Sequence, residues 1–205
     1  IVTGTGKVFC AGEDLSELSE GGECQTVTEH GFGGLTARLC SKPVIAACNG
    51  SAAGGGMEIA LSCDMVVASE RAKFGCTEVG LGIIPGFGGT QRMARIIGTG
   101  PAMELIYTAD TIDAQRALEI GMVNHVVPAD QLMDEAMKLA QKICPNAQKA
   151  IRASKLAIRR GIDCDISTAV SYEALAFATC FGTEDQKEGM QAFLEKRKEK
   201  HFKNK

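Results

Sequence analysis

The sequence predicts an α/β fold, in which a core of short buried strands is followed by a mostly helical C-terminal part. Two observations support this prediction. Residues 1–128 alternate short apolar runs with glycine-rich turns, whereas residues 129–205 show the wider spacing of apolar side chains that is typical of helices. We therefore expect a strand-rich core over 1–128 and a helical region over 129–205, with a soft boundary near Pro128.

The strands of the core are predicted from apolar runs of four to seven residues that turn residues bound on both sides. The first three are IVTG (1–4), PVIAAC (43–48) and CDMVVAS (63–69), and MVNHVV (122–127) is expected to be a further strand. Between the second and third runs, GGGMEIALS (54–62) predicts a short helix that begins after a glycine turn.

From Gly88 onward, capping residues predict a series of helices. Gly98 is expected to end the first of them, because glycine accepts the backbone conformation that follows a helix. Pro101 suits the first position of the next helix. A third helix is expected to have Asp113 as its N-cap and Gly121 as its stop.

The helical region is predicted to open with an amphipathic helix over 129–144, followed by two or three more helices up to the lysine-rich end. The expected apolar face of the first helix consists of Leu132, Met133, Ala136, Leu139, Ala140 and Ile143.

Composition argues against several classes of protein. The net charge of −3 lacks the basic excess of nucleic-acid binders, and no apolar run approaches the roughly 20 residues of a membrane span. Nine cysteines without a CxxC pair, and three scattered histidines, give a metal site little support. We expect reduced thiols in the cytoplasm, or in the mitochondrial matrix if a transit peptide lies upstream, because the chain opens within an apolar strand.

The three consecutive glycines at 54–56 allow two interpretations. They could form a turn that packs a helix closely on a sheet, or they could let a ligand atom approach the backbone N–H groups at a helix start. Dinucleotide binding is disfavoured, because GSAAGGG (50–56) and GLGIIPG (80–86) have the wrong spacing for the known fingerprint.

Two glutamates stand in apolar, glycine-rich surroundings. Glu58 has no charged neighbour over 43–63, and Glu78 has none over 74–91. Buried carboxyl groups have a raised pKa and are suited to proton transfer. On spacing alone, a pair of surface carboxylates near loops remains an equal alternative.

Three motifs resemble the enoyl-CoA hydratase/isomerase, or crotonase, family: FCAGEDL (9–15), NGSAAGGGMEIALSCD (49–64) and FGCTEVGLGIIPGFGGTQR (74–92). The resemblance continues through 117–127 to TEDQKEGMQAFLEKRK (183–198) and is greatest to the bacterial short-chain hydratases. It implies the crotonase fold, a spiral of ββα units forming two nearly perpendicular sheets, followed by a helical trimerisation region. Relative to the family, the first strands and part of the CoA pocket are expected to be missing.

The resemblance implies a lyase of fatty-acid β-oxidation or butanoate metabolism, which reversibly hydrates a short-chain trans-2-enoyl-CoA to the 3-hydroxyacyl-CoA without a metal or other cofactor. By motif position, Glu58 is the water-activating base and Glu78 is the proton donor. The backbone N–H groups of Glu13 and Gly55 are implied to form an oxyanion hole for the thioester carbonyl. A Δ3,Δ2-enoyl-CoA isomerase, and a non-catalytic crotonase-fold protein that binds RNA, stay open as alternatives.

The resemblance also implies a substrate and CoA site and an oligomer. The residues assigned to that site are Cys10, Ala11, Gly12, Asp14, Leu15, Gly54, Pro85, Gly86, Phe193 and Lys196. Phe193 and Lys196 are implied to contact the CoA nucleotide from a neighbouring subunit of a homotrimer or of a hexamer made of two trimers. The acyl chain length is not predicted, although 15–36 and 79–87 are expected to close the tail pocket.

Overall fold

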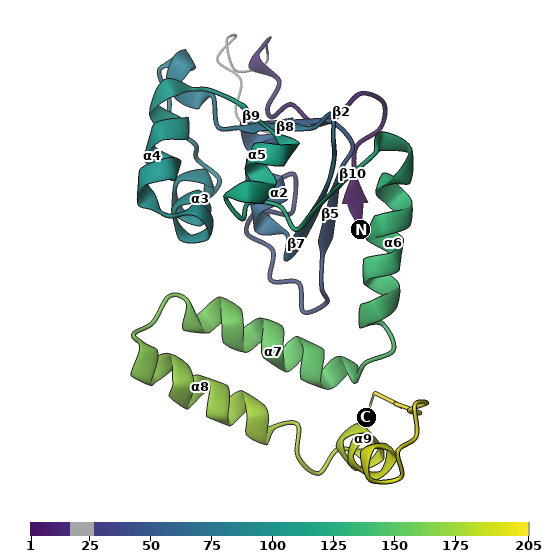
Figure 1. Cartoon of the computed structure of the whole chain (residues 1–205). Coiled ribbons are helices and arrows are strands. Elements are labelled where there is room, and N and C mark those ends of the chain that lie inside the picture. The colour runs from purple at the N-terminus through teal and green to yellow at the C-terminus, as the bar shows by residue number, and fades with distance from the viewer. Residues whose placement is uncertain (17–26, 205) are drawn as a thin grey trace. The chain divides into compact units, whose positions relative to one another are not determined.

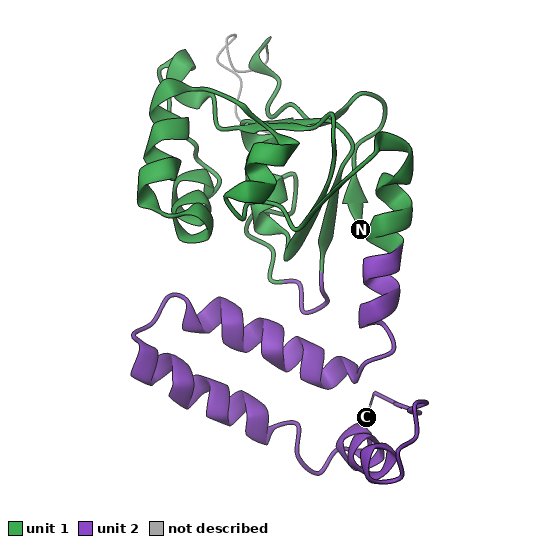
Figure 2. Ribbon diagram, viewed as in Figure 1, with its two compact units in different colours: residues 1–39, 44–137 green, residues 40–43, 138–205 purple. Residues whose placement is uncertain are grey.

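The computed structural model describes residues 1–16 and 27–204 (Figure 1). Its contacts group the chain into two units, unit 1 with residues 1–39 and 44–137 and unit 2 with residues 40–43 and 138–205 (Figure 2). The boundary expected near Pro128, between the strand-rich core and the helical region, stays a prediction.

In its described residues, unit 1 has two four-stranded sheets, and successive strands along the chain are shared between them. The first sheet is parallel, with the order β1 (Val2–Thr3), β5 (Ile45–Cys48), β7 (Met65–Ser69) and β10 (His125–Val127). The second has the order β2 (Val8–Cys10), β6 (Ser51–Ala53), β8 (Lys73–Gly75) and β9 (Ile112–Asp113), of which β9 is antiparallel to β8. Strands of the second sheet run across those of the first (Figure 1), which is the expected spiral.

The apolar runs of the sequence form the centre of the first sheet. Ala46 pairs with Val66 on one side, and its neighbour Ala47 pairs with Val67 in the same register. These strands are buried on both faces, so they read as continuous apolar runs without alternation. A separate antiparallel ladder joins β3 (Val27–Thr28) to β4 (Gly31–Phe32).

Helices follow the strand pairs of unit 1. From Gly55 onward they are α2 (Gly55–Ser62), the 3₁₀ helix η1 (Glu78–Leu81), α3 (Gly89–Ile97), α4 (Thr99–Thr108), α5 (Ala114–Glu119) and the 3₁₀ helix η2 (Ala129–Gln131). Asp113 is the N-cap of α5, as predicted, and accepts a hydrogen bond from the backbone N–H of Arg116 at 2.7 Å. Pro101 is the third residue of α4 and not the first, because Gly98 already turns the chain and the helix begins at Thr99.

Helix α6 (Leu132–Ile143) begins in unit 1 and ends in unit 2. Leu132 and Ala136 are buried as expected, but the side chain of Met133 is exposed, which corrects its place on the apolar face. Successive residues of a helix are rotated by 100°, so Met133 points away when its neighbour Leu132 faces the core.

Unit 2 contains three further helices, α7 (Gln148–Gly161), α8 (Ile166–Ala178) and α9 (Glu184–Leu194). Helices α7 and α8 pack against one another as an antiparallel pair (Figure 1). Large apolar side chains of this unit are exposed, and they include Ile158, Ile166, Leu175, Phe177, Phe193 and Leu194. In the part of the chain that the structure describes, no helix is long and apolar enough to cross a membrane.

Candidate active site

Each of the three glycines at the start of α2, namely Gly54 as its N-cap and Gly55 and Gly56 as its first residues, is required by its surroundings. Gly54 has a φ of 55° and a ψ of −129°, a backbone conformation that side-chain-bearing residues rarely adopt. A Cβ on Gly55 would lie 2.5 Å from the ring of Phe32, and a Cβ on Gly56 would overlap the carbonyl oxygen of Cys10. The triplet therefore lets the start of α2 lie directly against β2 and the Phe32 ring.

The start of α2 also meets the loop that follows β2. A Cβ on Gly12 would lie 3.2 Å from the backbone nitrogen of Gly55, so the segment that contains Gly12 and Glu13 runs beside the first turn of the helix. Within residues 1–16 and 27–204, the N–H of Gly55 has no hydrogen-bond acceptor, as is usual for the first residue of a helix. The structure thus brings Gly12, the residue before Glu13, next to the backbone nitrogen of Gly55.

Glu58 lies one turn further along α2 and is 1% exposed. Its Oε1 accepts hydrogen bonds from the backbone N–H groups of Phe87 at 2.6 Å and Gly89 at 2.7 Å. Gly89 is the first residue of α3, where the helix dipole favours a negative charge. The other carboxylate oxygen of Glu58, Oε2, has no hydrogen-bond partner among the described residues, so this oxygen is available to a ligand.

Glu78 is the first residue of η1, shortly after the end of β8, and is 9% exposed. Its Oε1 lies 3.6 Å from the position that a Cβ on Gly54 would occupy, so the carboxyl group borders the glycine turn. Its Oε2, like that of Glu58, has no partner in the described parts of the chain. Two buried carboxyl groups, each with one unpartnered oxygen, therefore flank the start of α2.

Burial raises the pKa of both carboxyl groups, but their surroundings differ. For Glu58, the hydrogen bonds from Gly89 and Phe87 and the positive charge of Arg92 oppose the raised pKa, because they stabilise the carboxylate. For Glu78, its own backbone N–H opposes the rise, whereas the negative charge of Glu58 adds to it. The charged form is therefore better supported at Glu58 than at Glu78.

A second layer of residues, which the sequence did not predict, holds the turn that binds Glu58. The rings of Phe87 and Phe32 are stacked, with centroids 4.8 Å apart. Arg92 donates one hydrogen bond to the carbonyl oxygen of Phe87 at 2.8 Å and another to that of Thr36. Arg92 is the first charged residue after Glu78 in the sequence. The uncharged segment before it was the only sequence signal that could have pointed to its contact with the Phe87 turn.

A buried thiol lies beside the two carboxyl groups. Cys76 is fully buried, and its Sγ lies 3.1 Å from the position of a Cβ on Gly89, which is itself 3.0 Å from Oε1 of Glu58. Burial raises the pKa of this thiol, and the negative charges of Glu78 and Glu58 add to the effect. Cys76 therefore stays a neutral, weakly polar neighbour of the pair.

The other residues assigned to the substrate site fall into two groups. Those of unit 1 lie at the end of β2 and in the residues that follow it, in the glycine turn and in the turn before α3: Cys10, Ala11, Gly12, Asp14, Leu15, Gly54, Pro85 and Gly86. Phe193, on α9, and Lys196 belong to unit 2. Of the segments expected to close the tail pocket, 17–26 lies outside the described residues, whereas Leu81, Ile83 and Ile84 are exposed.

Comparison with protein families gives one match over the whole chain. The family model for enoyl-CoA hydratase/isomerase matches residues 1–205. Among curated proteins, the chain is 53% identical to the short-chain-enoyl-CoA hydratase of Clostridium acetobutylicum, over 100% of this chain and 80% of that protein. It is 50% identical to the crotonyl-CoA hydratase of Syntrophomonas wolfei, over 97% of this chain and 78% of that protein.

Solved structures show the same fold. The enoyl-CoA hydratase of Bacillus anthracis superposes with a TM-score of 0.89 at 44% identity, over 99% of this chain and 80% of that one. EchA1, an enoyl-CoA hydratase of Mycobacterium marinum, superposes with a TM-score of 0.92 at 37% identity, over 100% of this chain and 80% of that one.

Proposed function

The chain belongs to the enoyl-CoA hydratase/isomerase family, and we propose that it reversibly hydrates short-chain trans-2-enoyl-CoA to 3-hydroxyacyl-CoA. The observation that carries this proposal is the pair of buried carboxyl groups of Glu58 and Glu78, each with an unpartnered oxygen beside the start of α2. Hydration needs one group that deprotonates water and another that supplies a proton, and the two glutamates suit these roles.

The surroundings of the two carboxyl groups support a division of labour. Glu58, with two backbone N–H donors and Arg92 favouring its charged form, takes a proton from water as the oxygen attacks the β-carbon. Glu78, whose charged form is opposed by burial and by Glu58, gives a proton to the α-carbon. The addition is redox-neutral and both protons are handled by carboxyl groups, so the reaction calls for no redox cofactor.

The thioester carbonyl is stabilised by the backbone in this proposal. The N–H groups of Gly55 and Glu13 donate to the carbonyl oxygen, on which negative charge develops as the enolate forms. Preorganised donors of this kind are typically worth about 3–4 kcal/mol of transition-state energy each. The approach of Gly12 to the Gly55 nitrogen supports the pairing of these two amides, and the dipole of α2 acts in the same sense.

Unit 2 is proposed to complete the CoA site and the assembly. Phe193, which is 80% exposed on α9, and Lys196 are assigned to the CoA nucleotide of a neighbouring subunit. We propose a homotrimer, or a hexamer of two trimers, because exposed apolar side chains such as Phe177 and Leu175 on α8 need a partner surface. The eight free cysteines among the described residues favour a reducing compartment, the cytoplasm, for this step of β-oxidation.

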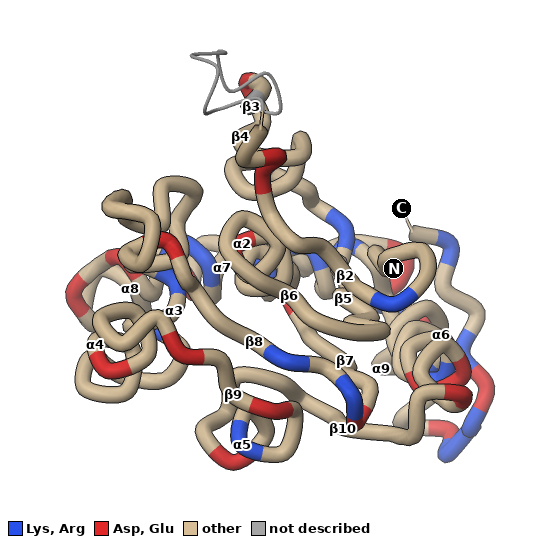
Figure 3. Tube along the Cα trace, turned by 90° about the horizontal axis from the view of Figure 1, so that it is seen from above, with Lys and Arg blue, Asp and Glu red and all other residues tan. Residues whose placement is uncertain are grey.

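The isomerase alternative is less favoured by the site. An isomerase needs a single base that moves a proton between two carbons, whereas the structure provides two buried carboxyl groups. The RNA-binding alternative would call for a basic stripe. Figure 3 instead shows lysine and arginine segments interspersed with aspartate and glutamate along the described chain, in agreement with the net charge of −3.

Isotope incorporation tests hydration against isomerisation. Crotonyl-CoA incubated with the enzyme in deuterated, ¹⁸O-labelled water should gain deuterium at the α-carbon and ¹⁸O at the β-carbon, as read by mass spectrometry. The Glu58→Gln variant is the matched control, because it lacks the proposed base and is expected to keep the fold, which circular dichroism checks. Rapid conversion of a 3-enoyl-CoA without ¹⁸O uptake would reject the hydratase and leave the fold and the backbone donors in place.

A further inference from the structure

The chain after α9, which we call the C-terminal tail (residues 195–204), folds back along that helix. Asp185, on the first turn of α9, is 2% exposed. It accepts hydrogen bonds from the backbone N–H of Lys203 at 2.6 Å and from that of Asn204 at 2.9 and 3.0 Å. The far end of the tail is therefore tied to the beginning of α9 by a buried carboxylate.

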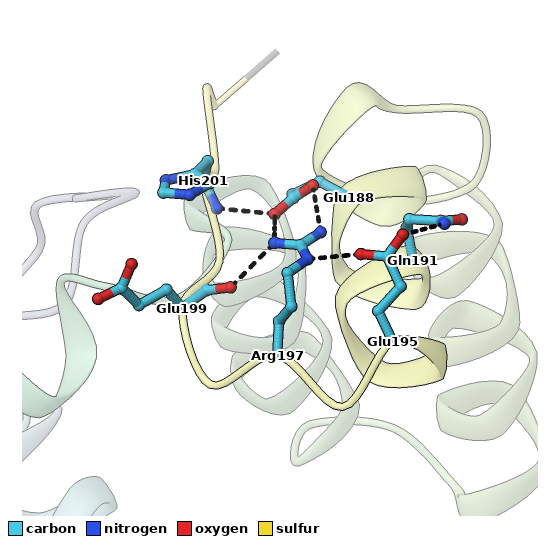
Figure 4. Close-up of polar contacts among 6 residues, drawn as sticks. All are labelled: Glu188, Gln191, Glu195, Arg197, Glu199 and His201. Carbon is cyan, nitrogen blue, oxygen red and sulfur yellow. Dashed lines mark hydrogen bonds and ion pairs between the residues drawn. The ribbon is translucent and has the colours of Figure 1, made fainter.

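A second carboxylate, one turn along α9, ties the near end of the tail (Figure 4). Glu188 accepts two parallel hydrogen bonds from the guanidinium of Arg197, at 3.0 and 3.2 Å, and a third from the backbone N–H of His201 at 2.9 Å. These bonds hold the pKa of Glu188 at about 2, with the hydrogen bond from Arg197 as the first cause. Bidentate pairing fixes the orientation of both groups as well as their distance.

Arg197 is held on its other sides too. Its Nε donates to the carboxylate of Glu195 at 2.6 Å, and Nη1 also donates to the carbonyl oxygen of Glu199 at 3.1 Å (Figure 4). Three segments of the chain thus meet at one guanidinium, namely α9 and the tail on each side of Arg197.

Lys196, between Glu195 and Arg197, has an unusual backbone. Its φ is 57°, in the left-handed region that helices normally reserve for glycine just after their last turn. Its N–H donates to the carbonyl oxygen of Phe193 at 3.1 Å, and the next N–H donates to that of Ala192 at 2.9 Å. A residue with a Cβ is strained there, so the neighbouring contacts must hold the lysine in place. Strain of this kind is concentrated at functional positions.

We propose that the Glu188–Arg197 pair is a positioning device, which fixes the backbone at Lys196 so that its ammonium group is presented to a phosphate of the CoA nucleotide. The inference rests on the proposed function, which assigns Lys196 to CoA. The pair acts through Lys196 and far along the chain from the carboxyl groups of Glu58 and Glu78. A pre-oriented cation loses less conformational entropy on binding, so the pair is expected to lower KM and leave kcat unchanged.

The decisive variant is Glu188→Gln, because charge and positioning predict opposite results. Removing a negative charge near a phosphate site would, by electrostatics alone, tighten binding and lower KM. Loss of the Glu188–Arg197 pair should instead raise the KM for crotonyl-CoA by about two- to fivefold at low salt, the scale of a surface ion pair, with kcat unchanged. Arg197→Gln should act in the same direction. Lys200→Gln, which removes one tail charge outside this network, is the control and should change KM less.

The Lys196→Ala background separates this inference from the proposed function. Lys196→Ala should raise KM by itself, and Glu188→Gln should then no longer raise it further. If Lys196→Ala leaves KM unchanged, the assignment of Lys196 to CoA is wrong, and the Glu188–Arg197 pair then positions no CoA-binding group. If Lys196→Ala raises KM but Glu188→Gln lowers it or leaves it unchanged, the positioning role alone is rejected. Should Arg197→Gln fail to fold, Glu188→Gln decides the question.

Discussion

Replacing Glu78 by glutamine should stabilise the protein increasingly as the pH rises, while removing its activity. Burial and the charge of Glu58 raise the pKa of this carboxyl group above the ordinary glutamate value of 4.5. Above pH 4.5 the folded protein therefore holds a proton that the unfolded chain has released. The free energy of unfolding of the wild type falls as the pH rises through this window, up to the folded pKa. Because glutamine does not ionise, the Glu78→Gln variant does not undergo this fall in the free energy of unfolding.

The expected magnitude has one pH-dependent and one constant part. The pH-dependent gain is about 1.4 kcal/mol for each unit by which the folded pKa exceeds that of the unfolded chain. The constant part is a cost, because Oε2 of Glu78 has no partner, and an amide N–H placed there would be a buried unsatisfied donor worth about 1–3 kcal/mol. The difference between pH 5 and pH 8 isolates the first part, since the second cancels.

Urea denaturation of the wild type and of Glu78→Gln at pH 5 and pH 8 measures this difference. The variant should gain stability relative to the wild type between the two pH values. Glu58→Gln should gain less, because two backbone N–H groups support the charge at that position. A stability difference that is equal at both pH values would show that Glu78 titrates as an ordinary surface carboxylate, which would remove the basis for its role as proton donor.

Two further predictions concern the same helix start. Glu58→Gln should lower kcat by about 100-fold or more, the scale of acid–base catalysis, in an assay that follows loss of the conjugated-thioester absorbance; turnover like that of the wild type would exclude Glu58 as the base. Gly56→Ala should destabilise the fold by about 1–3 kcal/mol, because its Cβ would overlap the carbonyl oxygen of Cys10. Gly100→Ala, in α4 with open space around it, is the matched control and should be neutral or stabilising, and equal melting temperatures for the two variants would contradict the packing argument.

Local signals in the sequence predicted several elements of the fold, whereas the two-sheet spiral was implied by the family resemblance. The apolar runs became β5 and β7, and Asp113 capped α5, because strand burial and helix capping depend on residues close together in the chain. Met133 was placed on the wrong face, since an apolar side chain on a helix can remain exposed when its neighbours fill the core. The start of α4 was also predicted two residues too late, at Pro101, because the turn at Gly98 lets the helix begin at Thr99.

The site was predicted in part. The isolation of Glu58 and Glu78 pointed to burial, which the structure has, but their catalytic roles stay predictions. The stacking of Phe32 on Phe87 and the two N–H donors to Glu58 could not be predicted, because these contacts join residues that no local pattern connects. Such contacts depend on how the turns between strands meet in space, which spacing along the chain does not encode.

The hydrogen bonds of Glu58 have a consequence for how the site comes into being during folding. Its donors, Phe87 and Gly89, are 29 and 31 residues away along the chain, so they reach the carboxylate only after a long loop has closed, at a cost in chain entropy. Before that step Glu58 is an ordinary hydrated glutamate. The buried, hydrogen-bonded state of this carboxylate therefore depends on the contact between α2 and α3, so that a change which separates the two helices also returns Glu58 to the hydrated state.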